Sequence, residues 1–331
     1  MTRYIPSPLR YPGGKQKDIP LLAGILEQFE RHNEIKEYRE PFLGGGSMLL
    51  YSIANLSAKK YWGNDAYPLL IDFWQETQEN VEELCELIKS LKEPYHGPTK
   101  RSQEWTEFRI KYFQKLNKLP NDRLHNAARF FILNRSTASG TTESGGMTPL
   151  AYCKRFTDSS IERLYNLKGY FNRNVKFTNL DYSKLLSGRK KGVFIFLDPP
   201  YLTAEKSALY GESGKLHKGF EHQLLAERLR KCPHNWLMTI DNSPEINELY
   251  SWANIISFYW KKPYSMTNIN SNKSIKDSGK LELLISSFEI DPDELANKKP
   301  NTVSMVYQNI NSEDLKYLDL ANKKEILVSP S

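Results

Sequence analysis

Cysteine is scarce in this chain, with three residues among 331: Cys85, Cys153 and Cys232. The number is odd, the spacing is wide, and no pair has the spacing of metal ligands, which argues against both a disulfide framework and a zinc site. We therefore expect the three cysteines to be packing residues, and we predict no metal at the functional site.

Long apolar runs are also missing from the sequence. The longest uninterrupted runs have the length of a strand, as in Val193–Leu197, and residues 1–10 carry no apolar signal-peptide core. Neither a membrane span nor secretion is indicated, so we expect a cytoplasmic protein with no membrane partner. Internal repeats and low-complexity blocks are absent as well. With 39% apolar residues, the chain can build one large α/β domain and a smaller one.

The positive charge of the chain is concentrated in one segment. The net charge is +7, and residues 99–176 contain 15 Lys and Arg against 6 Asp and Glu. Aromatic side chains such as Trp105, Phe113 and Tyr165 are interleaved with the basic ones, a combination that fits a nucleic-acid surface. The alternative is that the aromatic residues form a core and the lysines a solvated face, and the composition leaves both open.

Apolar spacing predicts alternating helices and strands in the first part of the chain. A glycine turn separates the first strand from the next helix, for which Ser47 is a suitable N-cap. Strand, glycine turn, helix and strand in this order open a doubly wound sheet. The expected helices cover residues 15–30, 47–56 and 68–91, and the expected strands cover 37–43 and 61–65.

The pattern changes after residue 92 to mainly helical spacing with many turn-forming residues. We interpret residues 93–173 as an inserted, mainly helical domain. The fold class is therefore α/β, with a doubly wound Rossmann-like sheet and an antiparallel C-terminal hairpin built from residues 1–92 and 174–290. Residues 291–331 are polar, and we expect only a loosely packed appendage there. The later strands are expected at 175–178, 193–197, 236–240, 255–260 and 281–288.

The most informative stretch is Asp198-Pro199-Pro200-Tyr201, directly after the apolar run Val193–Leu197. Two consecutive prolines fix φ and lack backbone N–H groups, so the turn is rigid and its carbonyls stay free to accept hydrogen bonds. An exocyclic amine could donate to Asp198 and to the Pro199 carbonyl while Tyr201 stacks on its ring. The arrangement suits chemistry on a flat, amino-bearing ring, although any turn at a strand end can carry prolines.

A second motif is the glycine turn Gly44-Gly45-Gly46-Ser47. Successive glycines let the backbone pass close to a ligand, and a helix starting at Ser47 points free N–H groups at an anion. A phosphate-binding loop would need Gly-Lys-Ser or Gly-Lys-Thr, whereas this chain has Gly46-Ser47-Met48. Nucleoside triphosphate binding is therefore disfavoured, and a purely conformational role of the glycines is the alternative.

Carboxylates follow two of the predicted strands. Asp65 lies where a doubly wound nucleoside site places an acid that accepts hydrogen bonds from both ribose hydroxyls. It could instead cap the helix that follows. Asp181, with Tyr182 beside it, follows the strand at 175–178 and could likewise cap a short helix at 183–186.

In their order along the chain, these motifs resemble the Dam-like (D12 class, alpha group) DNA adenine N6-methyltransferases, over about residues 7 to 288. The glycine motif, a large insert and then Asp-Pro-Pro-Tyr follow the order of that group, which favours adenine N6 over cytosine N4. The resemblance implies a methyltransferase sheet, S-adenosylmethionine as cofactor without a metal, and an adenine flipped out of the duplex. The implied catalytic residues are Asp198, Pro199, Pro200 and Tyr201. The implied cofactor-binding residues are Tyr11, Lys15, Phe42, Gly44, Gly45, Gly46, Ser47, Asp65, Asp181 and Tyr182.

The same resemblance implies that the insert reads a site in double-stranded DNA, with a turn or hairpin near 134–149 supplying base contacts. A glycine-rich, basic loop at 209–220 looks like a mobile cover over the flipped base. The candidate DNA contacts are Arg135, Arg155, Lys215 and Lys218. Residues 136–148 do not resemble the recognition hairpin of GATC-specific enzymes, so GATC is not the expected site. A cognate restriction endonuclease is a further candidate partner.

Two alternatives stay open. An RNA base methyltransferase would use the same pocket, but it usually needs no large duplex-reading insert. A non-catalytic DNA-binding accessory protein of the same fold would be expected only if Asp198 or Tyr201 were replaced, and both are present.

Overall fold

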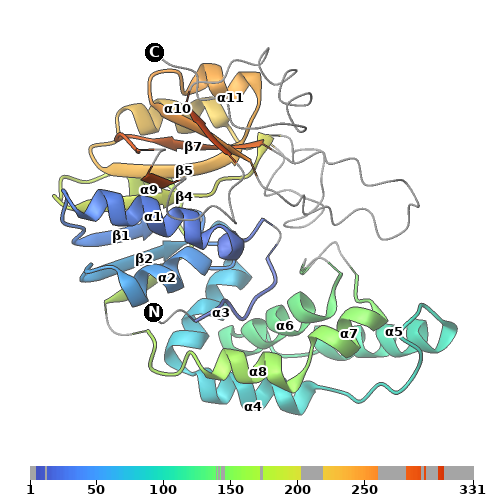
Figure 1. Cartoon of the computed structure of the whole chain (residues 1–331). Helices are drawn as coiled ribbons and strands as arrows, with labels where there is room; N and C mark the ends of the chain where they lie inside the picture. Colours follow the sequence, from blue (N-terminus) through green and yellow to red (C-terminus); the bar gives the residue numbers. More distant parts are fainter. Residues whose placement is uncertain are drawn as a thin grey trace.

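The computed structural model describes residues 5–11, 13–138, 140, 142, 146–171, 174–202, 219–259, 281–291, 294–295 and 305–308. Its centre is an eight-stranded sheet with the order β3-β2-β1-β4-β5-β7-β6-β8, flanked by helices (Figure 1). The strands are β1 (Glu37–Glu40), β2 (Lys60–Asn64), β3 (Val175–Thr178), β4 (Val193–Leu197), β5 (Asn235–Asp241), β6 (Asn254–Tyr259), β7 (Leu281–Ser286) and β8 (Met305–Gln308). The predicted α/β fold is confirmed.

The strand directions show where a ligand site belongs. Strands β1 to β5 run parallel, and the order in which the chain visits them reverses between β1 and β4. β7 pairs antiparallel with both β5 and β6, and β8 pairs antiparallel with β6. In open α/β sheets, ligands bind outside the carboxyl ends of the strands at such a reversal. The topology therefore points to the turns after β1 and β4.

The two central strands are buried for different reasons. All five residues of β4 are apolar and buried, and their side chains alternate, with Phe194 in one hydrophobic core and Ile195 in the other. β1 is buried although three of its four residues are charged. Arg39 Nε lies 2.7 Å from Glu37 Oε1, and the Tyr38 hydroxyl donates to Glu40 Oε1 at 2.8 Å. These partners make the burial of charge tolerable.

Helices cover both faces of the sheet. A 3₁₀ turn (Lys15–Lys17), α1 (Ile19–Glu30) and α2 (Ser47–Asn55) lie on one side, and α9 (Ser183–Leu186), α10 (His222–Arg230) and α11 (Pro244–Leu249) on the other (Figure 1). In α1, Pro20 occupies the first turn, where its missing N–H costs nothing, and the apolar residues that follow are buried against the sheet. Within the described ranges, no helix is long and apolar enough to cross a membrane.

The remaining helices form a helical lobe at one end of the molecule (Figure 1). They are α3 (Pro68–Glu79), α4 (Val81–Leu91), α5 (Gln103–Asn117), α6 (Arg123–Ser136), α7 (Pro149–Arg155) and α8 (Asp158–Tyr165). α3 and α4 pack against α6, and α4 also packs against α8. The lobe thus includes two helices that precede residue 93, and it shares one continuous core with the sheet. The domain boundary at residue 93 stays a prediction.

The single helix predicted over residues 68–91 is wrong, because the chain breaks it at Asn80 into α3 and α4. Asn80 has φ −139° and ψ 38°, outside the helical region. Its backbone N–H donates to the Glu76 carbonyl at 2.8 Å, and its Nδ2 donates to Glu76 Oε2 at 2.9 Å. Asparagine has a low helix propensity, which favours a helix end at this position.

Most aromatic residues of the basic segment belong to the core of the helical lobe. Those at most 7% exposed are Trp105, Tyr112, Phe130, Phe131, Tyr152, Phe156 and Phe171. Only Phe113 and Tyr165, at 44% and 41% exposure, present large surfaces to solvent. The structure therefore favours the core alternative for the interleaved aromatic residues, while the charge of the segment remains on its surface.

Part of the polar tail packs against the sheet, so the expectation of a loose appendage is wrong for the residues described there. β8 extends the sheet beside β6. Leu295 is 6% exposed and touches Gly24 of α1, and Glu294 pairs with Arg31. In residues 291–331 the apolar residues are isolated among polar ones, so the sequence pattern was too weak to predict a strand or helix there.

The other edge of the sheet is covered by side chains of α3. Gln75 Nε2 donates to the Phe177 carbonyl, and Gln78 Nε2 donates to the Val175 carbonyl, both at 3.0 Å. These carbonyls belong to β3, the first strand of the sheet order. The amide groups thus take the place that a further strand would occupy.

Candidate active site

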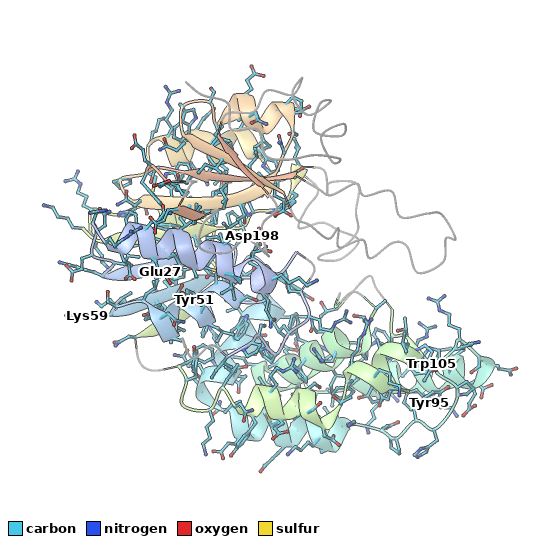
Figure 2. All side chains as sticks on the ribbon, in the orientation of Figure 1. Glu27, Tyr51, Lys59, Tyr95, Trp105 and Asp198 are labelled. Atoms are coloured by element: carbon cyan, nitrogen blue, oxygen red, sulfur yellow. The ribbon has the colours of Figure 1, made fainter. Side chains whose placement is uncertain are left out.

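The turn after β1 and the turn after β4 lie side by side, because β1 and β4 are neighbouring parallel strands. Asp198 follows β4, Asp65 follows β2, and Asp241 ends β5, so three carboxylates reach the same edge of the sheet. Asp198 lies near α1, whereas Tyr95 and Trp105 mark the distant end of the helical lobe (Figure 2). The motifs singled out in the sequence therefore meet at the topological reversal.

The glycine turn requires glycine at two positions. Gly44 and Gly46 have φ of 49° and 65°, in the left-handed region. A Cβ on Gly44 would lie 2.9 Å from the Tyr11 ring, and a Cβ on Gly46 would lie 2.8 Å from the Trp74 ring. Backbone conformation and the two rings together explain the glycines, and Tyr11 lies against the turn.

The helix after the turn offers backbone donors at its start. α2 begins at Ser47, and its N-cap Gly46 provides no side-chain hydrogen bond. The first N–H groups of a helix carry partial positive charge and suit an anionic group such as a carboxylate. The Ser7 hydroxyl donates to the Gly45 carbonyl at 2.5 Å and so holds the turn from the N-terminal side.

Asp65 connects the glycine turn to the start of α3. Gly44 N donates to Asp65 Oδ2 at 2.9 Å, and Tyr67 N donates to Oδ1 at 3.0 Å. Burial raises the pKa of Asp65 to about 6, and the backbone hydrogen bonds offset part of that effect. With Ala66 as a further backbone donor, the carboxylate still keeps acceptor capacity for a ligand. Local capping and ligand binding are therefore compatible at this residue.

Asp198 is held by two side chains that both contact the same oxygen. Lys15 Nζ lies 2.7 Å from Asp198 Oδ1, and the Thr239 hydroxyl donates to that atom at 2.9 Å. Burial lowers the pKa of Lys15, but Asp198, Tyr201, Glu282 and Asp18 together outweigh this effect, and the pKa lies well above its usual value. Lys15 is therefore an ammonium group in contact with the catalytic candidate. In this structure it approaches Asp198, whereas we had expected it to approach the cofactor.

The proline turn brings Tyr201 into the same cluster. Lys15 Nζ donates to the Tyr201 hydroxyl at 3.0 Å, and that hydroxyl donates to Glu282 Oε2 at 3.1 Å. Burial raises the pKa of Tyr201 well above its usual value, so the phenol stays neutral. The backbone N–H of Leu202 donates to Asp241 Oδ1 at 3.0 Å and fixes the end of the turn to β5.

Phe42 and Tyr182 form an aromatic group with Phe220. The ring centroids lie 5.3 Å apart for Phe42 and Tyr182, and 5.6 Å apart for Phe42 and Phe220. Asp181 Oδ1 accepts from Ser183 N at 3.0 Å and lies 3.3 Å from Arg228 Nη1, so it caps the start of α9. Phe42 and Tyr182 are thus brought together, while Asp181 already has local partners.

Arg135 does not fit the expected base contact. Its side chain is 8% exposed, and Nε and Nη2 donate to the Arg155 carbonyl at 2.9 and 2.8 Å. Its guanidinium fixes the end of α6 to the end of α7. Arg155 is more accessible, and its Nη1 donates to the Ala138 carbonyl at 2.6 Å. The other two candidates, Lys215 and Lys218, lie outside the described residues.

Sequence reasoning missed two residues that contact the cluster, Thr239 and Glu282. Thr239 is an unremarkable residue in an apolar strand and gives no signal. Glu282 does give one, because it is the only charged residue of β7, whose sequence is Leu-Glu-Leu-Leu-Ile-Ser. Within the described part of the chain, no group of three or more His, Cys, Asp or Glu side chains is placed to hold a metal ion.

Comparison with known proteins agrees with this geometry. Residues 11–264 match the family of D12 class N6 adenine-specific DNA methyltransferases. The Type II methyltransferase M.MjaIII of Methanocaldococcus jannaschii is 25% identical over 289 residues, which are 85% of this chain and 98% of that protein. The Type II methyltransferase M1.LlaDCHI of Lactococcus lactis is 22% identical over 84% of this chain and 94% of that protein. The modification methylase StsI of Streptococcus sanguinis is 28% identical over 90% of this chain, but only 45% of that protein is covered.

The family match spans most of the chain and includes both motifs at the reversal between β1 and β4. The chain belongs to the D12 class of N6 adenine-specific DNA methyltransferases.

Proposed function

We propose that this chain transfers a methyl group from S-adenosylmethionine to N6 of an adenine flipped out of a specific site in duplex DNA, with Asp198, Pro199, Pro200 and Tyr201 as the catalytic residues. The observation that carries these assignments is the position of Asp198 directly beside the glycine turn, at the reversal of the sheet. A donor held by the turn and an amine held by Asp198 would face each other across two neighbouring strands.

The residues around the glycine turn fit S-adenosylmethionine. The buried carboxylate of Asp65 can accept from the ribose hydroxyls, and the uncapped start of α2 can hold the carboxylate of the methionine part. The rings of Phe42 and Tyr182 offer an apolar surface for the adenine of the cofactor. When bound, the cofactor supplies an electrophilic methyl group.

Asp198 and Pro199 would activate the amine of the target adenine. Lys15 and Thr239 both contact Asp198 Oδ1, which leaves Oδ2 for an N–H of the amine. In the described part of the chain, the Pro199 carbonyl has no hydrogen-bond donor and can accept the second N–H. Positive charge grows on the nitrogen during transfer, so these acceptors stabilise the transition state more than the ground state.

Tyr201 would hold the extruded base. Flipping a base costs a few kcal/mol in lost stacking and pairing. Stacking on an aromatic side chain returns about 1 to 3 kcal/mol, which offsets much of that cost. The proline turn and the contacts of the Tyr201 hydroxyl fix this ring beside Asp198.

Arg10 and Arg155 are suited to hold the DNA backbone. Both donate to the Ala138 carbonyl, at 3.2 and 2.6 Å. Burial lowers the pKa of Arg135 to about 10, and the charges of Arg10, Arg163 and Arg155 act in the same direction. The positive charges of these four arginines act on one another, and an anionic phosphate near Ala138 would relieve their repulsion. Arg135 would act here by fixing the loop and not by touching a base.

The test is methyl transfer from labelled S-adenosylmethionine to duplex DNA and to folded RNA. We expect transfer to duplex DNA, a loss of at least about a hundredfold in Asp198→Ala, and retained cofactor binding by calorimetry. Asp158→Ala, which removes an 87% exposed carboxylate of the helical lobe, is the control and should keep full activity. Transfer to RNA alone would support an RNA methyltransferase, and unchanged transfer in Asp198→Ala would overturn the assigned mechanism.

Mapping methylated bases in DNA from cells that express the protein would identify the recognition site. We expect N6-methyladenine in a sequence other than GATC. The relatives named as type II methyltransferases and as a modification methylase support a cognate restriction endonuclease as a partner.

A further inference from the structure

Glu282 reaches the catalytic turn because β7 is antiparallel. The start of β7 lies at the edge of the sheet where the parallel strands end, and Glu282 is opposite Asp241 in the pairing of β7 with β5. The next three residues of β7, Leu283 to Ile285, are fully buried. Their burial fixes the backbone position of Glu282. This residue lies beyond residues 11–264, which match the family.

A chain of polar contacts links Glu282 to the catalytic carboxylate. Glu282 Oε2 accepts from the Tyr201 hydroxyl at 3.1 Å, and that hydroxyl accepts from Lys15 Nζ at 3.0 Å. Lys15 Nζ in turn lies 2.7 Å from Asp198 Oδ1. One lysine therefore bridges Asp198 and the phenol, and Glu282 holds the other side of the phenol.

The charges support this direction of hydrogen bonding. Burial raises the pKa of the Tyr201 phenol, and although Lys15 lowers it, Asp198 and Glu282 raise it further. The phenol therefore keeps its proton and can donate a hydrogen bond to the Glu282 carboxylate. The proline turn restrains the backbone of Tyr201, its ring packs against the hydrophobic core, and the hydrogen bonds of its hydroxyl to Lys15 and Glu282 hold the tip of the side chain.

We propose that Glu282 is a positioning residue of methyl transfer, which sets the orientation of the Tyr201 ring on which the target adenine stacks. The proposal rests on the methyl-transfer function proposed above. Glu282 touches neither substrate nor cofactor in this role. Its removal should therefore lower kcat for duplex DNA while leaving the affinity for S-adenosylmethionine unchanged.

The test uses the full-length protein and a double-mutant cycle. Glu282→Ala should lower kcat roughly tenfold or more, in line with the loss of one hydrogen bond to a charged group. Glu282→Gln keeps an acceptor oxygen and should recover most of the activity. In a Tyr201→Phe background, which lacks the hydroxyl, Glu282→Ala should cause no further loss, because the two changes remove the same contact. Glu248→Ala, an exposed carboxylate on α11, is the matched control.

Two results would overturn the proposal. The first is a wild-type kcat in Glu282→Ala. The second is that Glu282→Ala lowers kcat by the same factor in the wild type and in the Tyr201→Phe background. A ligand-free crystal structure of Glu282→Ala separates this proposal from the methyl-transfer function itself. The Tyr201 ring should leave its position there, and an unmoved ring would refute the role of Glu282 whatever the activity of the enzyme. Absence of transfer by the wild-type protein would instead refute the function.

Discussion

Lys15 Nζ lies 2.7 Å from Asp198 Oδ1 and ties the segment before α1 to the turn after β4. The lysine side chain is 5% exposed and the aspartate 20%. Removal of one member of a buried ion pair leaves the other charge unpaired, which costs about 3 to 5 kcal/mol. We expect Lys15→Met to lower the free energy of unfolding by about 3 kcal/mol, measured by urea denaturation at pH 7.

The neighbouring Lys17 is exposed and provides the control, since Lys17→Met should leave the free energy of unfolding almost unchanged. The double variant Lys15→Met with Asp198→Asn should recover part of the lost stability, because it no longer contains a lone buried charge. Equal stability of Lys15→Met and the wild type would show that the ion pair contributes nothing.

Asp18 predicts how stability depends on pH. Burial raises its pKa from 3.8 to about 7, Lys15 lowers it, Glu282 and Asp198 raise it, and Lys17 lowers it slightly. The folded protein then binds this proton more tightly than the unfolded chain, so the contribution of Asp18 to stability is complete below pH 4 and is lost as the pH rises through 7. The shift corresponds to at most about 4 kcal/mol. Because the side chain is partly exposed, we expect about half of that.

Asp18→Asn removes this titration. The variant should be more stable relative to the wild type at pH 8 than at pH 5, when both are compared by thermal or urea unfolding. A constant difference across this range would show that Asp18 does not titrate there.

Asp65 predicts the pH dependence of cofactor binding. Its pKa of about 6 reflects burial. An ionised carboxylate can accept from both ribose hydroxyls, whereas a protonated one loses an acceptor. The affinity for S-adenosylmethionine should therefore be constant above pH 7 and fall as the pH drops through 6, which calorimetry at a series of pH values would detect. In Asp65→Asn the affinity should be weaker and should no longer change near this pH.

Replacement of Gly46 by alanine should destabilise the protein in two ways, through the backbone conformation and through a steric clash, and a control variant can separate them. A residue with a side chain at φ 65° pays about 1 to 2 kcal/mol for the left-handed conformation. The Cβ of Gly46→Ala would also lie 2.8 Å from the Trp74 ring. Gly169→Ala is the matched control, because Gly169 has φ 71° and nothing within 4 Å of its Cβ position. Gly46→Ala should destabilise the protein more than Gly169→Ala does.

Replacement of Arg155 by alanine should change the salt dependence of DNA binding. If it contacts one phosphate, Arg155→Ala should reduce the slope of log affinity against log salt by about 0.9. The same value is expected for Arg10→Ala. Arg189 is exposed in the loop before β4, at the opposite edge of the sheet, and Arg189→Ala should leave the slope unchanged. A loss of affinity limited to one DNA sequence would indicate a base contact instead.

The sheet and the position of the proline turn at its edge could be predicted because their signals are local. An apolar run followed by Asp198-Pro199-Pro200-Tyr201, and a strand followed by successive glycines, mark where two strands end. The order of these motifs then indicated the D12 family. Each of these motifs is a short run of neighbouring residues, so it can be recognised without knowing which distant residues it contacts.

The errors concern residues whose role depends on distant partners. Arg135 is buried because the Arg155 carbonyl accepts its hydrogen bonds. Glu282 becomes part of the site only because β7 runs antiparallel beside β5. Hydrophobic periodicity cannot predict such pairings, because it treats every polar residue as exposed to solvent.

The glutamine amides along β3 have a consequence for self-association. An uncovered edge strand presents a row of hydrogen-bonding groups to any other chain, and this makes intermolecular sheet growth and aggregation easier. Gln75 and Gln78 occupy the carbonyls of β3 that such growth would need. These two side chains therefore disfavour the pairing of another chain with the β3 edge of the sheet.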